Sequence, residues 1–299
     1  MAKHGQTIQM FLMDGEADSR IKCTINGWTG VVYKIPRTQI NLCKDRDHLK
    51  QSGVYFLIGS GADPSEKSSL YVGQAGARKN GEGLLNRIQE HKRNPEKEFW
   101  SEAIAITTTD NTFGPTEISW LENRFCSLAN EANRAEVKNN IDPNSGNVSE
   151  ETESFLEDFI EKTLIILGAL GYKLFTPLTK EVNLDNSQTN FLQQDLLFYT
   201  ETKSDNSSRT VKATGCLTPE GFVVLKGSRV ALTPTTSCQN FIKNRRAKEQ
   251  EKITKDGILL EDLLFNSPST ASAFVWFSNR NGNTDWHTSD GKQFGSFDF

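Results

Sequence analysis

Hydrophobic residues in the first half of the chain form short runs of strand length, separated by turn residues. Such runs predict β-strands over residues 8–12, 21–25, 31–35, 53–59, 70–73 and 100–108. Asp14-Gly15 and Asn26-Gly27 separate the first three runs and favour tight turns there. From residue 84, and again over 116–136, hydrophobic residues recur at the spacing of a helix face. The pattern predicts an α+β fold in which helices flank a small sheet.

The stretch from Ser52 to His91 combines two of these strands with one helix. The strands carry Tyr55 and Tyr71, and the helix carries Arg87 four residues before His91. Residues four apart lie on the same helix face, so Arg87 and His91 are expected side by side. Strand ends can present the two tyrosines beside them.

These residues carry a resemblance to a known family. Gly53-Val54-Tyr55, then Tyr71-Val72-Gly73, then Arg87 with His91 one turn later resembles the GIY-YIG nuclease superfamily. The resemblance implies a metal-dependent endonuclease that hydrolyses DNA phosphodiester bonds, with Tyr55, Tyr71, Arg87 and His91 as catalytic residues. It implies that the planar, permanently charged guanidinium of Arg87 binds the scissile phosphate. Two alternatives are an RNA-directed nuclease and a catalytically inactive DNA-binding or regulatory protein on a nuclease scaffold.

The family also implies a glutamate on a later helix that binds a divalent metal ion, Mg²⁺ or Mn²⁺. The predicted helix that begins at Thr116 offers Glu117 and Glu122. Glu117 lies in the first turn, where the helix dipole favours a carboxylate without any metal. Glu122 follows the hydrophobic Leu121 and can point into a cleft, so we predict Glu122 as the catalytic metal ligand. An asparagine often follows this helix in the family, and Asn139 is the candidate here.

Three residues compete for the role of general base. An unperturbed histidine has a pKa of about 6.5, which makes His91 the easier base on intrinsic grounds. Tyr55 or Tyr71, with an ordinary pKa of about 10, would need a local depression of the pKa. The sequence leaves this choice open. Gln74 and Ala75 stand where some family members place a nearby lysine, so no direct role for a lysine is predicted.

The formal net charge of −4 is unusual for a nucleic-acid enzyme, because phosphate affinity comes from clustered Lys and Arg. Basic residues nevertheless crowd the motif helix and its flanks. We expect substrate contacts from Gly73, Arg78, Lys79, Lys92, Arg93 and Asn139. The alternative for the charged residues is an ordinary solvated helix face.

The chain is predicted to divide into a β-rich N-terminal extension (1–50), a GIY-YIG-like nuclease domain (51–141), a linker with a connecting helix (142–209) and a C-terminal accessory domain (210–299). The last part resembles a domain of unknown function often attached to GIY-YIG nucleases. We expect a separate small α+β domain that targets nucleic acid, with a protein-interaction or structural role as the alternative. Its candidate contacts are Lys226, Arg229, Lys243, Arg245, Arg246, Lys248, Trp276 and Trp286.

Other classes of protein are disfavoured by composition. No window approaches 18 consecutive apolar residues, and the start of the chain lacks the apolar core of a signal peptide. We therefore expect a cytoplasmic protein with no membrane partner. The five cysteines form no Cys-x-x-Cys pair, which argues against a zinc site and against a disulfide framework.

Overall fold

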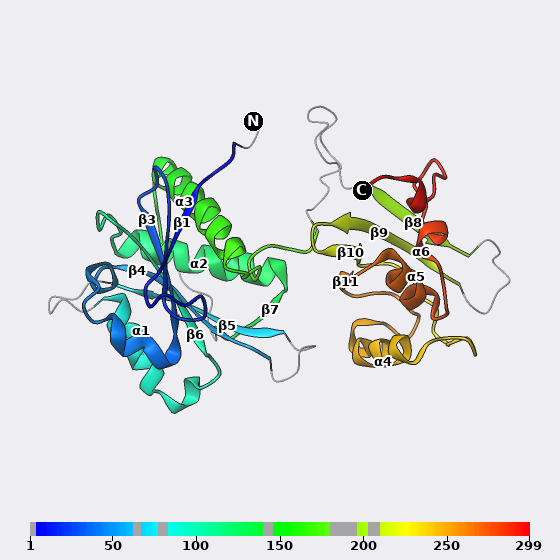
Figure 1. Cartoon of the computed structure of the whole chain (residues 1–299), viewed down its shortest axis with the longest axis horizontal. Coiled ribbons are helices and arrows are strands. Elements are labelled where there is room, and N and C mark those ends of the chain that lie inside the picture. The colour runs from blue at the N-terminus through cyan, green and yellow to red at the C-terminus, as the bar shows by residue number, and fades with distance from the viewer. Residues whose placement is uncertain (1–3, 62–66, 77–82, 140–145, 180–195, 203–209) are drawn as a thin grey trace. The chain divides into compact units, whose positions relative to one another are not determined.

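The computed structural model describes residues 4–61, 67–76, 83–139, 146–179, 196–202 and 210–299. The chain forms two compact units, Met1–Pro177 and Leu178–Phe299 (Figure 1). Both units combine strands with helices, so the predicted α+β class is confirmed. No helix within the described ranges is both long and apolar enough to cross a membrane.

The N-terminal unit is built on a mixed sheet. Its described strands have the order β1-β2-β3-β6-β4-β5-β7. Their bounds are Ile8–Leu12 (β1), Ile21–Ile25 (β2), Gly30–Pro36 (β3), Gly53–Gly59 (β4), Ser68–Ala75 (β5), Glu102–Thr108 (β6) and Ala135–Val137 (β7). Neighbouring strands pair antiparallel except β5 and β7, which pair in parallel.

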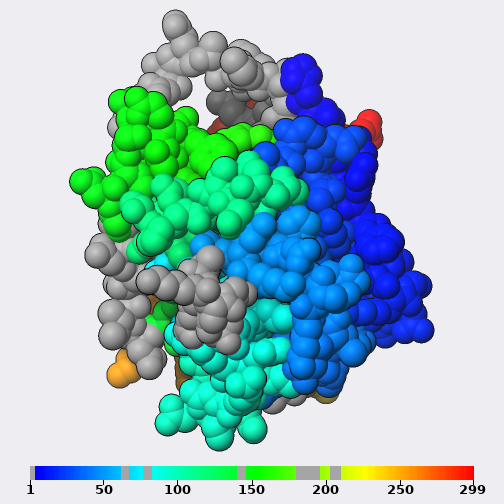
Figure 2. Space-filling view, turned by 90° about the vertical axis from the view of Figure 1, so that its left-hand side faces the viewer, coloured from blue at the N-terminus to red at the C-terminus, as the bar shows by residue number. Residues whose placement is uncertain are grey.

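The first fifty residues are not a separate extension. The three predicted strands are confirmed as β1, β2 and β3, but β3 pairs with β6 along its whole length, from Gly30 opposite Thr108 to Pro36 opposite Glu102. The four consecutive residues from Gly30 to Tyr33 of β3 are all buried, because both faces of the sheet are covered. In Figure 2 the dark blue N-terminal residues lie against the mid-blue residues that follow them in the chain, and the bright green residues of α3 lie against the blue-green residues of the preceding helix.

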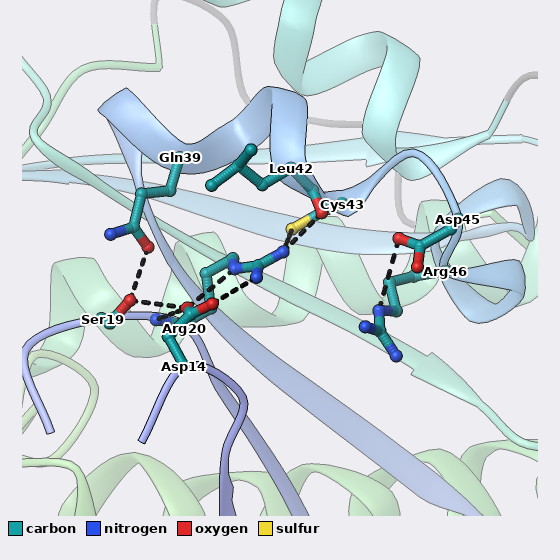
Figure 3. Close-up of polar contacts among 8 residues, drawn as sticks. All are labelled: Asp14, Ser19, Arg20, Gln39, Leu42, Cys43, Asp45 and Arg46. Carbon is teal, nitrogen blue, oxygen red and sulfur yellow. Dashed lines mark hydrogen bonds and ion pairs between the residues drawn. The ribbon is translucent and has the colours of Figure 1, made fainter. Parts of the chain in front are cut away.

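A buried arginine ties the N-terminal hairpin to the short 3₁₀ helix η1 (Arg37–Cys43) (Figure 3). The Arg20 guanidinium donates to both carboxylate oxygens of Asp14 and to the carbonyl oxygen of Leu42. The Ser19 hydroxyl lies 2.6 Å from Asp14 Oδ2 and 2.8 Å from Gln39 Oε1. The pKa of Asp14 is held well below its usual range, first by the hydrogen bond from Arg20. These contacts hold the turn between β1 and β2 against η1.

Helices cover both faces of the sheet (Figure 1). One core contains the face with Val54 and Phe56 and is closed by α2 (Pro115–Ala132) and α3 (Glu150–Ala169). The other contains the face with Tyr55 and Leu57 and is closed by α1 (Leu84–Arg93), η1 and the 3₁₀ helix η2 (Asp47–Lys50). The connecting helix predicted within residues 142–209 is present as α3, and it packs into the first core.

The helix predicted over 116–136 is shorter than expected. Asn133 adopts the left-handed conformation with φ of 52°, which ends α2, and the chain then forms β7 beside β5. A single asparagine in this conformation is a common helix stop. The hydrophobic pattern alone could not distinguish the end of α2 from the three-residue strand.

The C-terminal unit has its own sheet and core. Its described strands have the order β11-β10-β9-β8 and are antiparallel: β8 (Leu197–Glu201), β9 (Lys212–Thr218), β10 (Gly221–Val224) and β11 (Leu263–Phe265). Helices α4 (Asn240–Lys248), α5 (Pro268–Trp276) and α6 (Gly282–Asp285) complete this unit. The predicted boundary at residue 210 is therefore too late, because β8 pairs with β9 along its whole length. β8 is short and lies between polar segments, which hid it in the sequence pattern.

Two of the residues predicted to contact nucleic acid are instead part of this core. Trp286 is 0% exposed and donates from Nε1 to the carbonyl oxygen of Pro268. Arg246 is 4% exposed, and its guanidinium donates to the carbonyl oxygens of Ala231 and Phe274. Both side chains are thus used to hold the unit together.

Candidate active site

A tyrosine and a histidine from different elements form a short hydrogen bond in the N-terminal unit. Tyr55 Oη of β4 lies 2.6 Å from His91 Nε2 of α1. Tyr55 is 1% exposed, and His91 is also buried. The strand alternation that buries Tyr55 on the α1 side and the helix repeat that turns His91 toward the sheet produce this pair.

A glycine makes room for the Tyr55 ring. Gly73 of β5 is the register partner of Tyr55, and a Cβ atom at residue 73 would lie 2.4 Å from both Cζ and Oη of that ring. Real Cβ atoms do not approach so closely, and an aromatic ring cannot bend away as a flexible side chain does. Gly73, predicted as a substrate contact, thus has a direct role in positioning Tyr55.

Tyr71 of β5 extends the pair to an aromatic cluster. Its ring centroid lies 6.3 Å from that of Tyr55 and 5.2 Å from that of His91. The Lys97 ammonium, from the short 3₁₀ helix η3 (Pro95–Lys97), lies 3.4 Å from the Tyr71 ring centroid. Lys97 was not among the predicted site residues. The sequence feature that could have indicated it is its position just after α1, where a turn at Asn94-Pro95 can bring the chain back toward the cluster.

Arg87 lies on the accessible side of the cluster. Its Nη1 pairs with Glu90 Oε2 at 2.7 Å, and its guanidinium also interacts with the Tyr55 hydroxyl. Arg87 lines a cavity of about 280 Å³ together with Gln74, Ala75, Gly76 and Gly83. The predicted proximity of Arg87 and His91 to both tyrosines therefore corresponds to the arrangement in the structure.

The two candidate glutamates of α2 have different partners. Glu117 accepts a hydrogen bond from the Gly114 amide at 2.9 Å and so caps the helix N-terminus. Glu122 is half-buried and accepts hydrogen bonds from Gln74, and its charge interacts with Arg87. Burial raises the pKa of Glu122. Glu122 thus faces β5 beside the cluster, whereas the carboxylate of Glu117 caps the N-terminus of α2.

Asn139 holds the strand that carries Tyr71. Its Oδ1 accepts from the Val72 amide at 3.0 Å, and its Nδ2 donates to the Val72 carbonyl at 2.8 Å. The side chain therefore continues the β5–β7 pairing, which ends at Leu70 opposite Val137. Both ends of the amide are engaged with backbone, so the evident task of Asn139 is to fix β5 next to Tyr71 and Gly73.

The basic residues predicted around the motif divide into separate groups. Arg78 and Lys79 lie outside the described residues. Lys92 and Arg93 follow His91 directly on α1, where successive side chains point roughly 100° apart. They therefore do not share the helix face of Arg87 and His91.

Burial sets the protonation states of the cluster. It raises the pKa of Tyr55 far above the ordinary value and raises the pKa of Tyr71 as well. It lowers the pKa of His91 to about 4, with a further contribution from the positive charges of Lys97 and Arg87. The pKa of Lys97 falls to about 8, mainly through burial. At neutral pH both tyrosines are protonated and His91 is neutral, so Nε2 can accept the Tyr55 proton.

The residues present fit a divalent metal ion only with additional ligands. Among the described residues, no group of three or more His, Cys, Asp or Glu side chains could hold a metal ion. Glu122 offers a single carboxylate, a hard oxygen donor of the kind that Mg²⁺ prefers. Mg²⁺ commonly keeps several waters and binds through one or two carboxylates plus substrate phosphates, so one glutamate beside an open cavity is compatible with it.

Comparison with known proteins places one part of the chain. Residues 204–298 match a family model described as "Domain of unknown function (DUF4357)". This match confirms that a domain of unknown function occupies the C-terminal part of the chain, where we expected one over 210–299. No curated protein and no solved structure matches the chain.

Proposed function

We propose that the N-terminal unit is a metal-dependent endonuclease of the GIY-YIG type that hydrolyses DNA phosphodiester bonds. One observation carries the proposal: Tyr55, Tyr71, Arg87, His91 and Glu122 come from four separate elements and converge at β5. An arginine, a neutral base, hydroxyl groups and a carboxylate are the groups that phosphodiester hydrolysis needs.

The cations bind the phosphate in the proposed reaction. Arg87 lines the cavity beside Gln74 and presents a planar guanidinium suited to phosphate oxygens. Lys97 adds a second positive charge over the Tyr71 ring. The ion pair of Arg87 with Glu90 keeps the guanidinium in place before substrate arrives, and it is solvent-accessible enough to rearrange.

Proton transfer runs through the buried pair. Tyr55 takes a proton from the attacking water as its own hydroxyl proton passes to His91 Nε2, 2.6 Å away. The hydroxide adds to phosphorus, and the bond to the leaving oxygen breaks with its electron pair on that oxygen, which takes a proton from solvent. His91 is left as an imidazolium and later releases its proton to solvent. Arg87 and Lys97 hold the pKa of His91 low, so a phosphodiester that neutralises them makes His91 a stronger base. Substrate binding thereby prepares the base.

Glu122 is the residue that would hold the metal ion. A bound Mg²⁺ or Mn²⁺ would supply charge neutralisation at the phosphoryl oxygens. Gln74 donates hydrogen bonds to Glu122 and fixes the orientation of its carboxylate. Burial of Glu122 reduces the competition of water for these hydrogen bonds. DNA is the proposed substrate, and RNA is the alternative that the same chemistry would allow.

The experiment is an incubation of the purified full-length chain with Mg²⁺ or Mn²⁺ and supercoiled plasmid, single-stranded DNA or RNA. Nicked or linear plasmid that forms with the metal and is abolished by a chelator supports the proposal. Cleavage of RNA in place of both DNA substrates would change the substrate class. Absence of cleavage of all three substrates with either metal would favour the non-enzymatic scaffold.

A further inference from the structure

The C-terminal unit contains a cavity of its own, of about 470 Å³. It is lined by Thr200 and Glu201 of β8, by Trp276 at the end of α5, and by Arg280, Asp285 and His287. This size falls within the range of about 300–1,000 Å³ that is typical of small-molecule sites. The cavity lies entirely in the unit whose family has no assigned function, and it shares no residue with the cluster around Tyr55.

The guanidinium of Arg280 lies over the Trp276 ring in the lining of this cavity. Arg280 Cζ lies 3.9 Å from the ring centroid of Trp276, a distance at which the guanidinium covers the indole face. The Trp276 ring is itself fixed, because its Nε1 donates to Thr200 Oγ1 at 3.0 Å. The side of the guanidinium away from the ring is thus available to a planar ligand.

A chain of polar contacts holds Arg280 in this position. Arg280 Nη1 lies 3.5 Å from Asp285 Oδ1, and Asp285 Oδ2 accepts a hydrogen bond of 2.5 Å from the buried Ser272 hydroxyl. The adjoining wall is fixed by backbone pairing, with Tyr199 N 2.7 Å from His287 O and His287 N 3.0 Å from Tyr199 O. The side chains of Trp276, Arg280 and Asp285 therefore have partners within the unit that hold them in place before any ligand binds.

The charges of the lining select among ligand classes. Glu201 and Asp285 bring two carboxylates, against the single guanidinium of Arg280, which is already paired with Asp285. A phosphate group would face net negative charge there. A ligand cation cannot stack on the face of Trp276 that Arg280 covers, and the guanidinium of Arg280 repels it. An uncharged flat ring with N–H donors on its edge meets neither obstacle.

We propose that this cavity binds a nucleobase, which stacks on the guanidinium of Arg280 and donates an edge N–H to the carboxylate of Glu201. Bases stack readily on arginine planes as well as on aromatic rings, and carboxylates accept hydrogen bonds from exocyclic amino groups. The base comes either from a free nucleotide or from an unpaired strand. The proposal does not rest on the hydrolytic function of the N-terminal unit.

Calorimetric titration of the full-length chain with AMP, GMP, CMP and UMP tests the proposal, with ribose 5-phosphate as the probe that lacks a base. At least one nucleotide binds and ribose 5-phosphate does not. Arg280→Ala weakens that binding roughly ten- to hundredfold, the range expected for one lost stacking contact. Glu201→Gln, which changes an exposed side chain and leaves the fold intact, weakens it for bases with an amino edge. Lys255→Ala, which removes an exposed lysine outside the cavity, has the same affinity as the wild type.

A second arm identifies the source of the base. Oligo(dC) and an abasic oligonucleotide of equal length are titrated against the same variants. Binding of oligo(dC) that Arg280→Ala weakens and Lys255→Ala does not identifies an unpaired strand, and binding of mononucleotides alone identifies a free nucleotide. Equal binding of ribose 5-phosphate or of the abasic strand, or an affinity that neither Arg280→Ala nor Glu201→Gln changes, overturns the proposal. So does the absence of binding for every mononucleotide and for oligo(dC) at millimolar concentration.

Discussion

Tyr55 Oη lies 2.6 Å from His91 Nε2, and burial displaces the pKa values of the two groups in opposite directions. The tyrosine keeps its proton and the histidine stays neutral. The N-terminal unit contains a second pair of the same kind on the same face of the sheet, in which Tyr33 Oη lies 3.0 Å from His48 Nδ1. Arg87 and Glu122 act on the Tyr55 hydroxyl, whereas Arg46 is the arginine whose charge acts on Tyr33. The second pair is therefore an internal control for the chemistry of the first.

The contact between Gly73 and Tyr55 predicts that Gly73→Ala displaces the tyrosine. The added Cβ would lie 2.4 Å from the ring, so we expect a loss of about 1–3 kcal/mol in the free energy of unfolding and a slower cleavage reaction. Gly168→Ala in α3 is the matched control, because a Cβ there would meet no atom within 4 Å and the residue lies outside the cavity. Urea unfolding and plasmid cleavage measure both effects. Equal stability of the two variants would contradict the packing role of Gly73.

The different partners of Glu117 and Glu122 predict different effects of the same substitution. Glu122→Gln should lower the rate of metal-dependent cleavage at least about a hundredfold, because it removes the carboxylate proposed to hold the metal ion. Glu117→Gln should leave the rate unchanged and reduce stability by roughly 1 kcal/mol or less, since it weakens a helix cap. Cleavage assays at saturating Mg²⁺ and thermal unfolding distinguish the two. A loss of rate in Glu117→Gln alone would move the metal ligand to that residue.

Burial of neutral His91 predicts a pH-dependent stability. The pKa of His91 in the folded chain is about 4, below the value of about 6.5 for an unfolded chain, so the unfolded state binds more protons between these values. Stability contributed by His91 is therefore present above pH 6.5 or so and is lost as pH falls toward about 4, by roughly 3 kcal/mol at most. His91→Gln should lose less stability than the wild type over this window. Parallel urea titrations that gave identical pH profiles would show that His91 is not buried in its neutral form.

The position of Lys97 predicts two linked effects of Lys97→Ala. Removal of its charge should raise the pKa of His91, since Lys97 is one of the causes that lower it, and NMR titration of His91 measures this shift. The same variant should weaken DNA binding and reduce the salt dependence by about one phosphate contact. Arg93→Ala, which removes an exposed charge on another face of α1, is the comparison. An unchanged His91 pKa in Lys97→Ala would separate the lysine from the cluster.

More of the candidate site than of the fold could be predicted from the sequence. Helix spacing was enough to place Arg87 and His91 on one face, because that depends on local geometry, whereas the strand pattern showed only that Tyr55 and Tyr71 could lie beside them. The joining of β3 to β6 and of β8 to β9 depends on pairing between distant segments, which no local pattern encodes. Lys97 was missed as a site residue for the same reason, since its contact with Tyr71 is made only after η3 turns the chain back. Trp286 and Arg246 were predicted as nucleic-acid contacts from their residue types, but both side chains are buried in the C-terminal unit. Residue type alone does not show whether a side chain is exposed.

Initial rates of Mg²⁺-dependent plasmid cleavage by Tyr55→Phe and Tyr33→Phe, compared with the wild type, test the proposed function most directly. Each variant removes the hydroxyl of a buried tyrosine that is hydrogen-bonded to a histidine, and leaves the ring in place. Tyr55→Phe should cleave at least about a hundredfold more slowly, the effect expected for the loss of a proton-transfer group. Tyr33→Phe should cleave at the wild-type rate. Cleavage by Tyr55→Phe at the wild-type rate, or an equal loss in both folded variants, would contradict a catalytic role for the Tyr55–His91 pair.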